Sequence, residues 1–170
     1  MPASSSLLAA LALVAGVAPA CAAPGAPATT ALSTETTMTS FHAAGPFDVQ
    51  LAPQPATAPA ESAGLARMTI VKQFHGDLEA ASTGEMLAFR DPTGTSGGYV
   101  ALETVRGALG GRHGSFVLQH SSTMTRGEPA QSVTVVPDSG TGELAGLAGR
   151  MVIDIAANGA HAYRFDYTLP

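Results

Sequence analysis

Apolar and polar residues alternate with a period of two in eight short stretches of this chain. Successive side chains of a β-strand point to opposite faces, so the pattern predicts strands that each bury one face. Glycine, proline, aspartate and serine separate the stretches, as expected of turns. The expected strands are 47–51, 67–74, 83–90, 98–105, 115–123, 131–136, 150–156 and 161–169.

The chain shows no helical counterpart to this pattern, because no stretch combines apolar residues at helical spacing with capping residues. Eight short strands joined by glycine-rich turns favour a barrel or a sandwich, and closure removes the edges that a sandwich must protect. We therefore expect an all-β domain. Three glycines, Gly76, Gly107 and Gly142, each stand two residues before a leucine, where we expect a positive φ or a close backbone approach.

The N-terminal part of the chain is typical of an exported protein. The first 34 residues carry no Asp, Glu, Lys, Arg or His, and Leu7–Ala20 is an apolar run too short to cross a membrane. The only cysteine, Cys21, follows this run directly and resembles the acylated cysteine of bacterial lipoproteins. The alternatives are plain secretion, with cleavage after Ala20 or Ala22, and a misassigned start codon.

These features divide the chain into three parts. Residues 1–21 are expected to be a signal peptide of the lipoprotein type, and residues 22–44 an Ala/Pro/Thr-rich linker. The barrel domain is expected over residues 45–170. A second Pro/Ala stretch, residues 52–64, is best explained as a long surface loop inside the domain, and the alternative is an extension of the linker.

Composition excludes several classes of function. Thirteen acidic and eight basic residues are spread without blocks, so a nucleic acid is not an expected partner. With Cys21 in the leader, the domain holds no disulfide and no thiol nucleophile. The five histidines lack metal-binding spacing, so we expect no metal and no cofactor. The G-x-S-x-G match around Ser96 lies between two expected strands, whereas a nucleophile elbow needs a helix after it.

His120 is the most informative polar residue. Counting by two places it on an apolar face with Phe116, while Tyr99 and Glu103 share a face of the preceding strand. If a hairpin turns at "LGGR", the numbers of paired residues sum to 221–223, which sets Glu103 opposite or diagonal to His120. A carboxylate beside an imidazole orients its ring.

The pair is open to three interpretations: a structural pair, a ligand-binding site, or a general base with its orienting group. The candidate site in the barrel interior is His120, Glu103, Tyr99 and Phe116. Lys72 and Glu85 can join it, although the facing of their strands is less certain from the pattern. No catalytic residue is assigned.

Four stretches carry a resemblance to a known family: "KQFHGDLEAASTGEMLAF", "GGYVALETVRGALGGRHGSFVLQHSSTM", "SVTVVPDSGTGELAGLAG" and "AYRFDYTL". Together they resemble the bacterial family of unknown function numbered thirty-two twenty-four, over about residues 45–169. The resemblance implies a single eight-stranded antiparallel β-barrel similar to that of allene oxide cyclase, without an established activity. The leader and the Pro/Ala stretch depart from the family pattern.

Two classes of function follow. The first is a non-enzymatic barrel of the cell envelope that binds a small apolar or amphipathic ligand or acts as a scaffold. The second is an isomerase or cyclase that acts on an unsaturated, lipid-like substrate by proton transfer, which rests on the fold analogy. Membrane contact is expected only through a lipid anchor at Cys21. Apolar residues on more than one face of "VTVV" (133–136) and "MVIDIAA" (151–157) favour a homo-oligomer.

We predict that the chain is processed at or beside Cys21, because the uncharged apolar run ends there. Intact-mass analysis of protein made in a bacterial host is expected to show a mature form without the leader. Cys21→Ala separates lipid anchoring, which it abolishes, from plain secretion, which it leaves intact. A chain that still carries Met1 contradicts the prediction.

Overall fold

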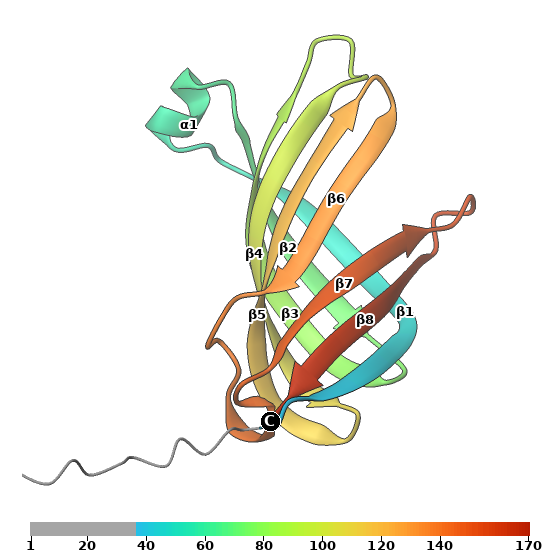
Figure 1. Cartoon of the computed structure of the whole chain (residues 1–170). Coiled ribbons are helices and arrows are strands. Elements are labelled where there is room, and N and C mark those ends of the chain that lie inside the picture. The colour runs from blue at the N-terminus through green and yellow to red at the C-terminus, as the bar shows by residue number, and fades with distance from the viewer. Residues whose placement is uncertain (1–36) are drawn as a thin grey trace, which may run out of the picture. The chain divides into compact units, whose positions relative to one another are not determined.

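All eight predicted strands form, and most are longer than the alternation indicates. The computed structural model describes residues 37–170, so Cys21 and the predicted signal peptide lie outside the described residues. Each strand pairs with its sequence neighbours in antiparallel register, and β8 returns to β1 to close a barrel (Figure 1). The strands are β1 Thr39–Gln54, β2 Ala66–Phe74, β3 Leu78–Arg90, β4 Gly97–Leu109, β5 Arg112–Thr125, β6 Glu128–Val135, β7 Ala148–Ile155 and β8 His161–Leu169.

The first strand starts six residues before the predicted start of the domain near Gly45. β1 begins at Thr39 and pairs with β8 from Thr39–Leu169 to Phe47–His161. The alternation misses this part because its inward positions are mostly small: Ala43 is buried and Gly45 has no side chain. Here β8 supplies the pairing that the local pattern does not specify.

The Pro/Ala stretch holds one short helix, α1 Ala58–Ser62, between β1 and β2. Thr57 caps it by accepting a hydrogen bond from the Ala60 N–H at 3.4 Å. A second single turn, η1 Gly142–Leu144, precedes β7. None of the helices within residues 37–170 is long and apolar enough to cross a membrane.

The barrel interior holds two apolar clusters of unequal size. The larger contains the aromatic side chains, with Phe116 stacked on Phe165 at 5.9 Å and Phe74 edge-on to Tyr163 at 5.6 Å. The smaller consists of Ile70, Met86 and Ala101. Along both β2 and β4, a buried charged residue stands between a member of one cluster and a member of the other. Four polar side chains, Lys72, Ser82, Glu103 and His120, thus form a polar layer between the clusters.

β6 and β7 are paired over the shortest length of any two neighbouring strands in the barrel. Their register contains two pairs, Val133–Met151 and Thr134–Arg150. Beyond these pairs the two strands run apart toward the end of the barrel that carries α1 (Figure 1). The rim at that end, which we call the mouth, is therefore open between β6 and β7.

The glycines singled out in the sequence lie where the backbone needs them. Gly76 and Gly142 have φ values of 91° and 61°. At Gly107 the reason is close approach, because a Cβ would press on the Glu79 carbonyl oxygen and lie 2.6 Å from the Ala80 Cα of β3. This glycine lets β3 and β4 pair at that point.

Gly107→Ala is expected to lower the free energy of unfolding by about 3 kcal/mol or more, because two strand backbones must separate. Gly111→Ala is the control: its φ is 80°, but a Cβ there meets nothing within 4 Å. Only backbone strain remains at that site, about 1–2 kcal/mol. Urea unfolding of both variants measures the difference, and equal losses would contradict the role of the close approach.

Candidate functional site

Glu103 stands at the centre of the polar layer and is fully buried. Its Oε1 accepts a hydrogen bond from the Ser82 hydroxyl at 2.6 Å. Its Oε2 accepts one from the Lys72 ammonium, also at 2.6 Å. The Nε2 of His120 lies 3.1 Å from the same Oε2. One carboxylate thus meets three polar side chains from three other strands.

The strand register brings these four residues together. Lys72 of β2 pairs directly with Ser82 of β3, and Glu103 of β4 pairs with Gly84, two residues further along β3. A Cβ at Gly84 would lie 2.8 Å from the Glu103 Cα and 3.0 Å from its Cβ. The glycine therefore gives the carboxylate room to turn toward Lys72 and Ser82.

The predicted relation between Glu103 and His120 is confirmed in its diagonal form. The β4–β5 hairpin turns at Gly110 and Gly111, and its paired residue numbers sum to 221. Glu103 accordingly pairs with Leu118, while His120 pairs with Ala101. Both side chains point into the barrel, where they are buried.

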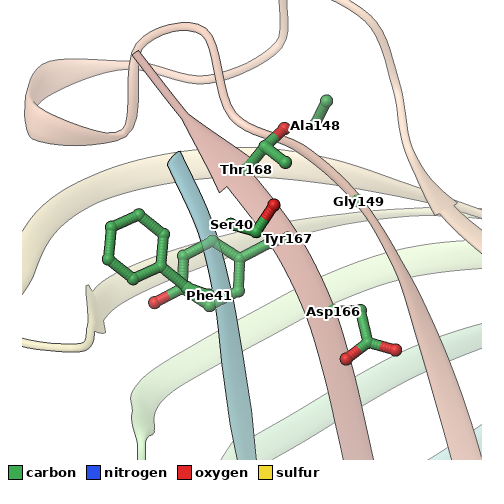
Figure 2. A pocket seen from close by; sticks show the side chains of 7 residues that line it. All are labelled: Ser40, Phe41, Ala148, Gly149, Asp166, Tyr167 and Thr168. Atoms are coloured by element: carbon green, nitrogen blue, oxygen red, sulfur yellow. The ribbon is translucent and has the colours of Figure 1, made fainter. Parts of the chain in front are cut away.

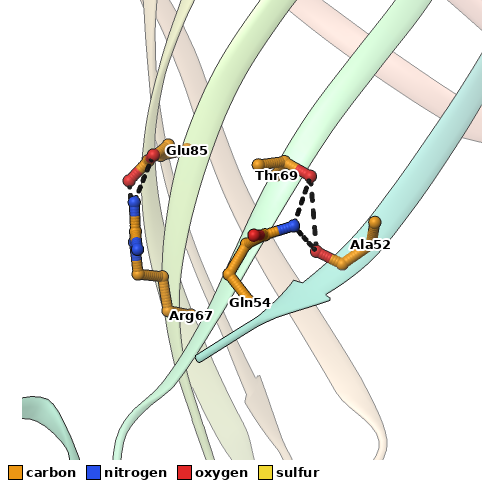
Figure 3. A network of polar contacts seen from close by, with 5 residues as sticks. All are labelled: Ala52, Gln54, Arg67, Thr69 and Glu85. Carbon is orange, nitrogen blue, oxygen red and sulfur yellow. Dashed lines mark hydrogen bonds and ion pairs between the residues drawn. The ribbon is translucent and has the colours of Figure 1, made fainter. Parts of the chain in front are cut away.

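The other predicted residues take different places. Tyr99 is a partly buried neighbour of the smaller cluster, and its hydroxyl accepts a hydrogen bond from the Gln131 amide at 3.1 Å. Phe116 belongs to the larger cluster and packs on Phe165 rather than on the polar layer. Glu85 points outward and bonds Arg67 at 2.9 and 2.5 Å (Figure 3). Side chains alternate between the two faces of β3, and Glu85 lies on the outer face.

Sequence reasoning missed Ser82 altogether and left Lys72 uncertain. Ser82 lies one residue before the predicted start of its strand, in the stretch Leu78–Ser82, which has no β-branched residue. Ser82 could have been predicted from the alternation along β3. Leu78, Ala80 and Ser82 occupy every second position, and they lie on the same buried face as Met86. This alternation also places Lys72 inside, because Lys72 pairs with Ser82.

With the site described, comparison with known proteins identifies the family. The sequence model of the family described as "Protein of unknown function (DUF3224)" matches residues 43–167. The chain belongs to the DUF3224 family. A crystal structure of a DUF3224 protein of unknown function from Shewanella oneidensis MR-1 is similar, with 49% sequence identity and a TM-score of 0.69. The match covers 77% of this chain and 96% of that chain. No curated protein matches the chain.

Glu103 of this DUF3224 protein is ionised at neutral pH. Desolvation by burial, the largest single effect, acts to raise the pKa of its carboxyl group. His120, Lys72 and Ser82 together outweigh it, so the pKa falls from an ordinary 4.5 to about 2. The barrel therefore keeps a buried negative charge beside the Lys72 ammonium, which also lies 5.3 Å from the centre of the Phe47 ring.

His120 is the member of the layer that lacks a complete set of partners. Its side chain is 3% exposed, yet its Nε2 has no hydrogen-bond partner with proper geometry among the described residues, despite the short distance to Glu103. The contact with Glu103 does not count as a hydrogen bond, because a hydrogen bond weakens steeply when it is misaligned. A buried ring nitrogen without a partner carries a cost, so a further polar group placed beside it is favoured.

The inward side chains on the mouth side of the polar layer are mainly apolar. Four of them pack against the smaller cluster and are only partly buried. They include an aromatic ring, a thioether and small side chains, a lining that can adapt to an apolar ligand. These residues are Val49, Met68, Ala88 and Tyr99.

Other polar features of this DUF3224 protein offer less chemistry. A shallow groove of about 260 Å³ crosses β1, β7 and β8 (Figure 2). Its one carboxylate, Asp166, pairs with His42 at 2.8 Å. Ser96 lies in the β3–β4 turn, where its hydroxyl accepts a hydrogen bond from the Arg126 N–H. Within residues 37–170, no three metal-binding side chains gather.

The ionised carboxylate predicts a specific loss of stability in acid. The pKa of Glu103 is lowered in the folded state, so its contribution is complete above about pH 4.5 and is lost as the pH falls toward 2. The difference amounts to about 3 kcal/mol. Chemical unfolding of Lys72→Met/Glu103→Gln, which leaves no unpaired charge, is expected to show a correspondingly flatter pH dependence in this window. Glu61→Gln on exposed α1 is the control and is expected to keep the pH dependence of the unchanged protein. A double variant whose stability falls as steeply with pH as that of the unchanged protein contradicts the assignment.

Proposed function

We propose that this protein is a non-enzymatic barrel that binds a small amphipathic molecule at its mouth. The apolar part of the ligand lies against Met68, Ala88 and Tyr99, and its polar end reaches down to His120. The observation that carries the proposal is the buried Nε2 of His120, which lacks a hydrogen-bond partner at the floor of a partly exposed apolar lining.

The charges of the polar layer indicate which group meets the ligand. Lys72 and Glu103 form an ion pair at 2.6 Å, and Ser82 donates to the second carboxylate oxygen. These three side chains thus satisfy one another and stay fixed. His120 is left to exchange its poorly aligned contact with Glu103 for a hydrogen bond to the ligand.

The leader adds a compartment to the proposal. An apolar run that ends at Cys21 supports export to the cell envelope, by lipid anchoring or by secretion. A barrel outside the cytoplasm can hold a poorly soluble molecule between membranes or at a membrane surface. The proposed ligand is accordingly apolar or amphipathic.

A second function, proton transfer to or from an unsaturated ligand, is favoured by one observation. Glu103 lies 3.1 Å from the His120 Nε2, and a carboxylate in that position is the usual orienting partner of a histidine base. In this case His120 is a general base for an isomerase or cyclase reaction. Turnover of an unsaturated ligand by the purified protein, lost in His120→Leu, distinguishes this function from binding alone.

The binding proposal is tested with a long-chain unsaturated fatty acid and the alcohol of the same length as probes. Isothermal titration calorimetry is expected to show saturable binding of at least one probe by the unchanged protein. His120→Leu is expected to weaken binding about tenfold or more, the worth of one lost polar contact, while the free energy of unfolding stays within about 1 kcal/mol.

Gln119→Leu supplies the matched control, because its side chain is exposed on the outer face of the same strand. It is expected to leave binding unchanged. If His120→Leu instead lowers stability by about 1–3 kcal/mol and leaves probe binding intact, His120 is a structural partner of Glu103. Failure of the unchanged protein to bind either probe also contradicts the proposal.

A further inference from the structure

The outer face of the barrel carries an apolar surface that the ligand site does not use. Four large side chains on β3 and β4 are between 41% and 57% exposed. Isolated apolar residues on a surface are ordinary, but a contiguous group with a polar rim marks an interaction site. We call this group the β3–β4 patch: Leu87, Phe89, Val100 and Leu102.

The strand register shows that the patch is contiguous. Leu87 pairs directly with Val100, and Phe89 and Leu102 are their diagonal neighbours. The outward residues of β2 to β5 form rows that cross the strands. One row is Arg67, Leu87, Val100 and Ser121, and the adjacent row is Thr69, Glu85, Leu102 and Gln119.

The patch contains both a hollow and a projection. A shallow hollow of about 480 Å³ is lined by Leu65 and by the outward residues Leu87, Phe89 and Val100. The inward residues Ala88 and Tyr99 also border it, so the hollow lies next to the rim of the mouth. Leu102 is not part of this lining and is 57% exposed in the next row. A projecting leucine thus lies one row away from an apolar hollow on the same face.

We propose that the β3–β4 patch is the interface of a two-fold symmetric dimer of this chain. The two-fold axis lies midway between two facing barrels and runs across the strands, between the two rows. Rotation about this axis lays the first row of one protomer on the second row of its partner. Leu102 of each protomer then faces the partner's Val100 row, where the hollow lies. A self-complementary surface is the requirement of an isologous interface.

The charges beside the patch obey the same symmetry. Arg67 lies in the row of the hollow and Glu85 in the row of Leu102, and the two pair across β2 and β3 (Figure 3). The axis that exchanges the rows sets the Arg67 row of one protomer against the Glu85 row of its partner. The dimer therefore places each Arg67 one strand away from the partner's Glu85 at one edge of the apolar centre, which favours a second copy over an unrelated partner.

A stable interface between two protein chains has a characteristic size and composition. Such an interface buries about 800 Å² on each partner, with an apolar centre and a polar rim. The β3–β4 patch supplies the centre, and Thr69, Ser121 and Gln119 supply part of the rim. The surface differs from that expected in the sequence, because Val133 and Val135 of β6 are buried in the core.

Sedimentation equilibrium of the full-length chain over a range of concentrations tests the dimer. The expected result is a reversible dimer of the 17.0 kDa chain. Leu102→Ser and Phe89→Ser are each expected to raise the dissociation constant at least about tenfold, because each removes apolar contact in both protomers. Ile155→Ser, at a position on β7 that is 66% exposed, is the control and is expected to leave the constant unchanged.

Charge exchange separates the proposed axis from nonspecific apolar association. Arg67→Glu is expected to weaken the dimer, and Arg67→Glu/Glu85→Arg is expected to restore it. Thermal melts confirm that each variant remains folded. A monomer at all concentrations, a trimer, or a dimer that the patch variants and Ile155→Ser affect equally overturns the proposal.

Discussion

The buried carboxylate of Glu103 is the interaction on which half of the barrel depends. Lys72 of β2 and Ser82 of β3 satisfy its charge, and His120 of β5 lies beside it, so these strands must keep their register around β4. A slip of one residue in any of them would turn its contribution to the outer face. Breaking a buried pair by removing one partner costs about 3–5 kcal/mol, so alternative registers are strongly disfavoured. The polar layer thus specifies the alignment of strands whose apolar residues alone would tolerate several.

Stability alone gives no reason to keep such a layer. Replacing a buried ion pair with well-packed apolar residues is often neutral or stabilising, and the clusters on both sides of the layer already supply apolar neighbours. The layer also includes a ring nitrogen of His120 that the fold leaves without a well-aligned partner. A purely structural network would be expected to satisfy all its members. This unsatisfied nitrogen is the observation on which the proposed binding function rests.

The sequence predicts the strands and one pair of the site, but not the complete layer. The Glu103–His120 relation follows from a tight hairpin, because the turn fixes which residue numbers pair. Lys72 and Ser82 depend on the registers of β2 and β3, and there the alanine- and glycine-rich stretch from Ala80 to Gly84 weakens the alternation. For the same reason Glu85 looked like a neighbour of the site, although it points outward. The start of β1 at Thr39 was unpredictable locally, since pairing with β8 determines it.

Only two residue pairs join β6 to β7, so the barrel has one seam that is closed over a short length. Between other strands, widening the rim would break a row of backbone hydrogen bonds. Between β6 and β7, most of the strand length has no such bonds. Breathing motions therefore concentrate at this seam. The turns that end at the seam lie outside the strands whose register Glu103 fixes. A change in their length would therefore alter the width of the mouth and leave the polar layer beneath it in place.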